Sequence, residues 1–216
     1  MKARILFASS LFGIAGIASA SFYQLDDGVS ESSLSTSGSN LNVIFLTQYT
    51  VQAGGTTLTS IDLVWGDRFS ANLANGTPTQ VLLMSDPNND GNPNDSTVIQ
   101  AINTTAANVG TDTFNNYAIT PVSMSVGTSF FVGGFIPNLV SGTAWAAVDT
   151  SAVGMAGRNF WQPQGLPGST SYLPYSIFGT NDGTFMVRAN ATSVPEPASM
   201  TAVAVGALAL LRRRRR

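Results

Sequence analysis

Short apolar segments alternate with polar ones along most of this chain. Between residues 21 and 193 the candidate strands are 41–51, 56–65, 80–85, 97–102, 112–119, 129–136, 143–149, 157–161, 175–178 and 184–190. In one of them, Ile61, Leu63 and Trp65 point to one side and Asp62 and Val64 to the other. A period of two is that of a β-strand, and none of these segments carries a capped helical stripe.

Turn-forming residues separate these predicted strands. About ten short strands with such turn signals predict an all-β domain, an antiparallel β-sandwich of jelly-roll-like type, with a barrel as the alternative. The run Phe130-Phe131-Val132 predicts a central strand that is covered on both faces. Residues 21–40 have few apolar positions, so we expect an edge strand at 22–25 followed by a loose loop.

The N-terminal segment, residues 1–20, has a different pattern. It begins with Lys2 and Arg4, continues with an apolar run and ends in Ala18-Ser19-Ala20. This is the pattern of a secretory signal peptide, a short helix that signal peptidase removes, here after Ala20. An N-terminal membrane anchor is the alternative, although the run is shorter than the roughly 20 residues of a membrane span.

The C-terminal segment, residues 194–216, contains Pro195, Glu196 and Pro197 followed by an apolar run at 200–211. The chain then ends in five arginines: Arg212, Arg213, Arg214, Arg215 and Arg216. The apolar run predicts a single hydrophobic helix, short for a permanent membrane span. By the positive-inside rule the arginines form a cytoplasmic stop, so the body lies outside.

These three C-terminal elements, in this order, resemble the PEP-CTERM sorting signal. The resemblance covers 194–216 and implies that an exosortase processes the tail near the Pro-Glu-Pro motif. It also implies an exported protein, anchored in the cell envelope or released into the extracellular matrix. A simple tail anchor is the alternative. Short pieces of the body, including 86–93 and 144–149, resemble the ectodomain of many proteins with this tail, which implies no particular activity.

The composition of the body, residues 21–193, excludes several classes of function. Eleven acidic residues and three arginines give it a net charge of −8, and it contains no Lys, His or Cys. Catalytic triads that need His, Cys nucleophiles, Schiff-base lysines and zinc sites built on Cys or His are therefore excluded. So acidic a domain is also a poor partner for nucleic acid. Ser, Thr, Asn and Gly must form most of its surface.

The segment 86–95 is the candidate metal site. Oxygen-bearing side chains alternate along it with Gly at the sixth position, as in the first half of a calcium loop; they are Asp86, Asn88, Asp90 and Asn92. An EF-hand is excluded, because Thr97 stands where a bidentate Glu is needed. Two interpretations stay open. One is a Ca²⁺ site completed by Asp26, Asp27 or Glu31; the other is a turn built from strong turn formers.

A second candidate site is the aromatic segment 160–175, which is rich in Pro and Gly and therefore predicts a loop. Trp161, Tyr172 and Tyr175 could present ring faces to the sugars of an extracellular polysaccharide. The alternative is that these rings fill the ends of the sandwich, since aromatic side chains bury large apolar areas. Trp65 and Trp145 lie in strand patterns and are expected in the core.

Catalysis by this body would have to use carboxylates, because no other side chain titrates near neutral pH. The candidates are Asp62, Asp67, Asp112, Asp149 and Asp182, and no spacing selects the pair that a glycosidase needs. Arg188 is expected to pair with Asp149 or Asp62 across the strands. We therefore expect a non-enzymatic module for adhesion or polysaccharide binding. The alternatives are a carboxylate-dependent polysaccharide hydrolase or lyase and a purely structural surface protein.

Overall fold

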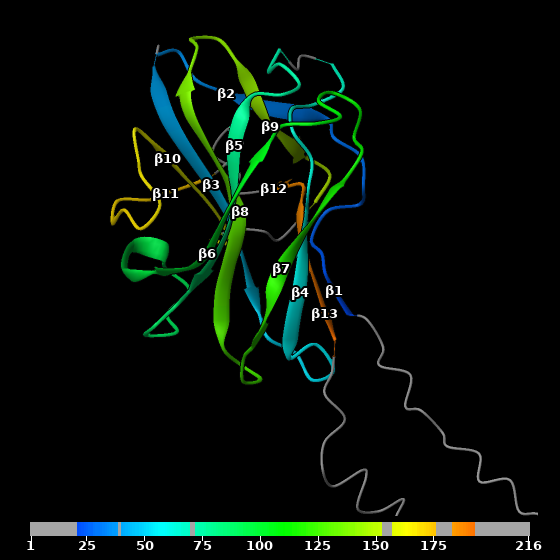
Figure 1. Ribbon diagram of the computed structural model, residues 1–216, viewed down its shortest axis with the longest axis vertical. Coiled ribbons are helices and arrows are strands. Elements are labelled where there is room, and N and C mark those ends of the chain that lie inside the picture. The colour runs from blue at the N-terminus through cyan, green and yellow to red at the C-terminus, as the bar shows by residue number, and fades with distance from the viewer. Residues whose placement is uncertain (1–20, 39, 70–71, 153–156, 176–182, 193–216) are drawn as a thin grey trace, which may run out of the picture. The chain divides into compact units, whose positions relative to one another are not determined.

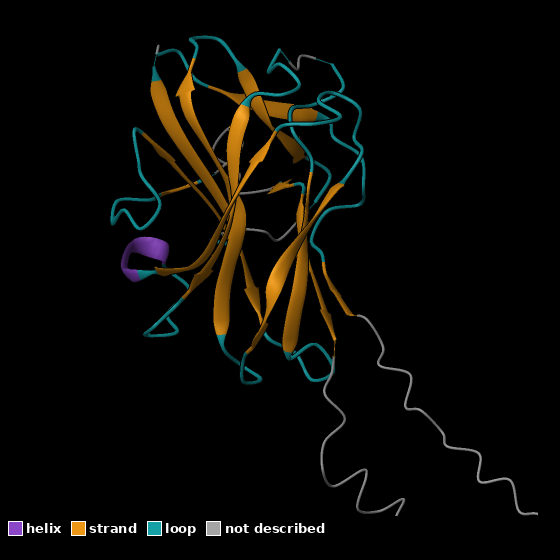
Figure 2. Cartoon of the chain, in the orientation of Figure 1, coloured by secondary structure: helices purple, strands orange, loops and turns teal. Residues whose placement is uncertain are grey.

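The computed structural model describes residues 21–38, 40–69, 72–152, 157–175 and 183–192. Nearly all of their regular structure is β, and every strand pair is antiparallel (Figure 2). Residues 20–194 form one compact unit. The predicted signal helix and C-terminal helix lie outside the described residues. Within the described part, no helix is long and apolar enough to cross a membrane.

Three sheets make up this unit (Figure 1). The six-stranded sheet has the order β11 (Leu173–Pro174), β10 (Asn159–Pro163), β3 (Leu41–Thr50), β8 (Ser129–Leu139), β5 (Pro78–Ser85) and β6 (Thr97–Thr105). The four-stranded sheet has the order β1 (Ser21–Tyr23), β13 (Val187–Thr192), β4 (Thr57–Leu63) and β7 (Asn115–Ser123). A three-stranded sheet joins β12 (Thr184–Phe185), β9 (Ala144–Asp149) and β2 (Ser32–Ser35). A short 3₁₀ helix, η1 (Pro93–Asp95), lies between β5 and β6.

The main core lies between the six-stranded and the four-stranded sheet. It contains Phe45 of β3 and Val132 of β8 from one sheet, and Ile61 of β4 and Val187 of β13 from the other. Trp65, Trp145 and Phe185 pack around Phe45, with ring centroids 5.3–5.9 Å from it. The predictions of a β-sandwich and of buried Trp65 and Trp145 are confirmed.

The central strand β8 is covered on both of its faces. Phe130 and Val132 belong to the main core, whereas Phe131 belongs to a second apolar cluster on the opposite face of the sheet. Tyr172 is buried in this second cluster, because the chain after β10 crosses that face of the sheet. The doubly covered central strand predicted from the run Phe130-Phe131-Val132 is confirmed.

Two glycines of β8 permit close packing at the centre of the sandwich. A Cβ on Gly133 would lie 1.8 Å from the carbonyl oxygen of Phe45, so a side chain there would displace the neighbouring strand. At Gly134 a Cβ would lie 2.7 Å from the Phe45 ring and 2.9 Å from Trp65. Gly134 thus leaves room for the rings of Phe45 and Trp65, whereas Gly133 leaves room for the backbone of β3.

Two details of the sequence interpretation were wrong. The segment 21–40 is not a loose loop throughout, because β2 pairs with β9 and Asp26 is buried. The segment 160–175 is not a loop throughout, because Trp161 lies in β10, the strand expected at 157–161, where it pairs with Phe45 of β3. In both segments, pairing with strands that are distant in sequence decides the conformation. The local content of Ser, Gly and Pro does not predict this pairing.

Candidate functional site

The connection between β5 and β6, residues 86–95, is a tightly hydrogen-bonded loop. Asp86 is buried at its start, and its carboxylate accepts the N–H groups of Asn89 (3.0 Å) and Gly91 (2.7 Å). Gly91 has a positive φ of 80°, which an L-residue rarely adopts. The loop therefore closes around the carboxylate of Asp86.

The alternating side chains of this loop each cap a backbone N–H two residues further on. Asn88 Oδ1 accepts from the N–H of Asp90 (3.0 Å), and Asp90 Oδ1 accepts from that of Asn92 (2.7 Å). Asn92 Oδ1 accepts in turn from Asn94 (3.1 Å). This is the behaviour of Asx turns, so the turn interpretation of the motif is confirmed.

Three carboxylates of the same loop also converge. Asp86, Asp90 and Asp95 each offer an oxygen, and these oxygens lie within 4.8 Å of one another. Asp90 and Asp95 are exposed, so a cation can reach them from solvent. Carboxylate and amide oxygens are the ligands that Ca²⁺ prefers. The residues present fit this ion, although Asn88 and Asn92 already serve the turn, and the Ca²⁺ site stays a prediction.

Asp95 is the residue that the sequence interpretation missed in this group. It lies in η1, where Asn92 caps the short helix and Pro93 starts it. The sequence did contain a signal for it, because Asp95 is a further oxygen-bearing residue at the tenth position of the segment, four residues after Gly91. Neither Asp27 nor Glu31 joins this group, so the expectation that they complete it was wrong.

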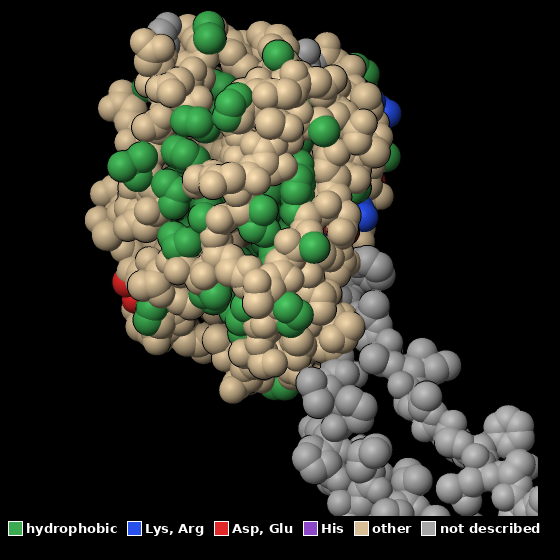
Figure 3. All heavy atoms as spheres, in the orientation of Figure 1, with side chains coloured by type: hydrophobic (Ala, Val, Ile, Leu, Met, Phe, Trp, Pro, Cys, Tyr) green, Lys and Arg blue, Asp and Glu red, His purple; other side chains and the backbone are tan. Residues whose placement is uncertain are grey.

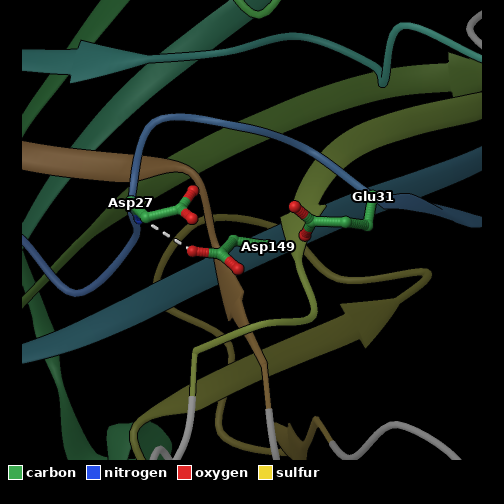
Figure 4. Close-up of side chains that lie close together, drawn as sticks. All are labelled: Asp27, Glu31 and Asp149. Atoms are coloured by element: carbon green, nitrogen blue, oxygen red, sulfur yellow. Dashed lines mark hydrogen bonds between the residues drawn. The ribbon is translucent and has the colours of Figure 1, made fainter.

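Asp27 and Glu31 instead form a second acidic group with Asp149 (Figure 4). The carboxylate of Asp149 is buried and accepts the N–H groups of Asp27 (2.8 Å), Ser151 (2.8 Å) and Ala152 (3.0 Å). Glu31 Oε2 accepts the N–H of Thr150 (2.8 Å). This group ties the segment after β1 to the end of β9, a structural role.

The structure separates the three aromatic residues of the second candidate site. Tyr172 is buried in the outer apolar cluster, so its ring offers no open face. Trp161 and Tyr175 are half-buried and pack against the main core, and the Tyr175 ring lies 4.8 Å from that of Phe185. The three rings therefore form no common platform, and the interpretation that they fill the sandwich explains their positions.

Both candidate segments nevertheless meet on the outer side of the six-stranded sheet. The N–H of Tyr172 donates to Asn94 Oδ1 at 2.7 Å, which joins the chain after β10 to the 86–95 loop. On its other side, the loop contacts the β7–β8 turn through Asn89, which accepts from Ser129 N–H and donates to Gly127 O. An ion bound in this loop would thus stabilise the contacts among three connections of the sandwich. They are the β5–β6 loop itself, the chain after β10 and the β7–β8 turn.

The arginines of the body differ in their surroundings. Arg188 pairs with buried Asp26, with Nε 3.1 Å from Oδ2, and its guanidinium lies 3.8 Å from the Phe114 ring centroid. The expected partners Asp149 and Asp62 were wrong, because the segment after β1 brings Asp26 to this place. Arg68 lies 3.8 Å from Asp112. Arg158 is exposed and forms no ion pair with any described residue.

The carboxylates proposed for catalysis are engaged in hydrogen bonds. Asp62 accepts from the side-chain amides of Asn116 (2.6 Å) and Asn190 (2.8 Å). Asp112 accepts from Ser30, and Asp67 accepts the N–H of Phe69. Asp182 lies outside the described residues. No spacing in the sequence selected a pair among these candidates; of those that the structure describes, Asp149 belongs to the acidic group with Asp27 and Glu31.

Two comparisons with known proteins are informative, one for the C-terminal segment and one for the whole chain. Residues 193–216 match the family model of the PEP-CTERM protein-sorting motif. No curated protein is significantly similar to this chain. The chain therefore carries the sorting motif that its Pro-Glu-Pro and arginine cluster predicted. The motif marks an exported protein sorted by an exosortase, with membrane association at its C-terminus.

Proposed function

We propose that the β-sandwich is a non-enzymatic module for adhesion or polysaccharide binding, displayed at the cell envelope or released into the extracellular matrix. The observation that carries this proposal is that the described carboxylates considered for catalysis already accept hydrogen bonds within the domain. Asp62, Asp112 and Asp149 each accept hydrogen bonds that hold strands or loops together. A glycosidase needs one carboxylic acid that donates a proton and a second carboxylate free to act.

The uncharged polar surface of the module supports binding to a hydroxyl-rich polymer such as a polysaccharide. The face in Figure 3 consists mainly of uncharged polar and apolar groups, with charged side chains at its margins. Residue types with amide and hydroxyl groups can donate to and accept from sugar hydroxyls.

The proposal includes a Ca²⁺ ion bound at the 86–95 loop. A cation held by Asp86, Asp90 and Asp95 would relieve the mutual repulsion of three carboxylates. It would also stiffen the contacts of this loop with Tyr172 and Ser129. Its role in the proposal is to stabilise the module, and no chemical step depends on it.

The test uses the purified body, residues 21–193, and a panel of immobilised polysaccharides. Retention and released sugar are measured together, in Ca²⁺ and again in EDTA. Retention without released sugar is the expected result. Release of soluble sugar would replace the proposal by a carboxylate-dependent enzyme. Neither retention nor release, with the body folded, would favour a purely structural surface protein.

A further inference from the structure

A small polar pocket lies where the end of β3 meets the chain that follows β1. Its volume is about 140 Å³, and its lining includes Gln24, Tyr49, Thr50, Gln52 and Arg158. This is below the roughly 300–1,000 Å³ of pockets that enclose a drug-sized ligand. The pocket therefore suits one functional group of a ligand, while the rest of the ligand lies outside.

The charge of this pocket is opposite to that of the body around it. None of the residues lining it is acidic, and it contains Arg158, the arginine without an ion-pair partner among the described residues. The other two arginines are neutralised by Asp26 and Asp112. Within a body of net charge −8, the lining of this pocket thus carries one positive charge and no negative charge.

The charge of Arg158 influences the hydroxyl of Tyr49, another residue of the pocket lining. Burial raises the pKa of the Tyr49 hydroxyl far above its ordinary value, Asp26 adds to that rise, and the charges of Arg188 and Arg158 oppose it. The Tyr49 hydroxyl donates to the carbonyl oxygen of Val187 at 2.5 Å, so it is already engaged. Among the described residues, the charge of Arg158 has no ion-pair partner.

Neutral donors stand beside this charge. Within the described residues, the side chains of Thr50 and Gln52 have no intramolecular hydrogen-bond partner, and both are exposed at the pocket. The backbone N–H of Gln52 donates to Tyr23 Oη, which fixes the chain at this point. An amide and a hydroxyl next to a guanidinium suit a carboxylate that is attached to a hydroxylated ring.

We propose that this pocket, with Arg158 as its anchor, binds the carboxylate of an acidic sugar such as a uronate. The planar guanidinium pairs with a carboxylate through two parallel hydrogen bonds. One positive charge balances a carboxylate, whereas a phosphate dianion would need more. The inference rests on the proposed polysaccharide-binding function and names the sugar class that it recognises.

The test is a titration of the purified body, which is a compact unit with its own core, with D-glucuronate, D-glucose and acetate. Chemical-shift changes of Arg158, Gln52 and Thr50 are recorded by NMR. Saturable binding of glucuronate, weaker binding of acetate and none of glucose are expected. Arg158→Gln is expected to weaken glucuronate binding about tenfold or more. Arg68→Gln removes the same charge elsewhere and is expected to leave the affinity unchanged.

Several results would overturn this proposal. They are the absence of glucuronate binding by the folded body, equal binding of acetate and glucuronate, or an equal effect of the two arginine variants. The backbone oxygen of Arg158, not its side chain, accepts from Gln48 in the sheet, so Arg158→Gln is expected to fold. One result would separate this proposal from the proposed function. If wild type does not bind glucuronate, but Arg158→Gln still binds a polysaccharide, the uronate site at Arg158 is refuted and the proposed polysaccharide binding stands.

Discussion

The side-chain amide of Gln100 on β6 pairs with the backbone of Thr120 on β7 in both directions. Its Nε2 donates to the Thr120 carbonyl oxygen at 2.7 Å, and its Oε1 accepts the Thr120 N–H at 3.0 Å. β6 and β7 are edge strands of two different sheets. One side chain thus closes the side of the sandwich that backbone pairing leaves open, and it occupies backbone groups that another chain could pair with.

Gln100→Ala is expected to lower the free energy of unfolding by about 1 kcal/mol, because two hydrogen bonds are lost at a partly exposed site. It is also expected to increase concentration-dependent association through the freed edge of β7. Urea unfolding and light scattering measure the two effects. Gln80→Ala is the control, since the Gln80 side chain donates to the Asn103 side chain on the neighbouring strand and, among the described residues, forms no hydrogen bond to the other sheet. Equal behaviour of the two variants would contradict the role of Gln100.

The pair between Asp26 and Arg188 is expected to contribute strongly to stability. The Asp26 side chain is fully buried, so Asp26→Ala leaves a guanidinium without its partner and should cost about 3 kcal/mol or more. The double variant Asp26→Leu with Arg188→Met should recover part of this loss, because no buried charge remains. Arg68→Gln serves as a control at the exposed pair, where less than about 1 kcal/mol is expected. Chemical denaturation of the four proteins tests the order.

Calcium is expected to raise the melting temperature of the body, and EDTA should reverse the rise. A ligand at about a hundred times its Kd stabilises a folded protein by about 2.7 kcal/mol. The variant Asp90→Asn with Asp95→Asn should lose this response without unfolding, because both side chains are exposed. Asp27→Asn, in the other acidic group, should retain it. A calcium response that depends on Asp27 and not on Asp90 would contradict the 86–95 site.

Two tyrosines predict the behaviour of the protein in alkali. Burial raises the pKa of Tyr172 and of Tyr175 to about 12, above the ordinary value of 10.0. The unfolded chain therefore loses these protons first, and stability should fall as the pH rises from about 10 towards 12. Denaturation across this range, followed by tyrosinate absorbance, measures the loss. The variant Tyr172→Phe with Tyr175→Phe should show a smaller decrease; an unchanged decrease would assign it to other groups.

The C-terminal motif predicts processing that can be tested apart from the body. Residues 194–216, fused to an exported reporter, should change its size and location in a host that has an exosortase. Replacing Pro195, Glu196 and Pro197 by Ala should abolish the change. The same fusion in a strain without the exosortase is the control. Identical products from the native and the altered tail would show that the motif does not direct sorting.

The sequence by itself determined the features that depend on local pattern. The period of two around Ile61, the apolar run at Phe130 and the turn signals were enough to predict an antiparallel sandwich and its doubly covered strand. The sorting motif of the C-terminal segment could also be predicted from the sequence, because such a motif is recognised as a linear segment. The Asx turns of the 86–95 loop followed for the same reason, since each joins residues two positions apart.

Only the tertiary structure decided which distant residues meet. Arg188 pairs with Asp26 across 162 positions, and no local pattern distinguishes that acid from Asp62 or Asp149. The same holds for the end of β10 at Pro163, which depends on pairing with β3 and not on the Pro and Gly residues around it. The pocket at Arg158 also has contributions from separate segments. Contacts of this kind depend on chain topology, because they gain their free energy only when the sheets come together.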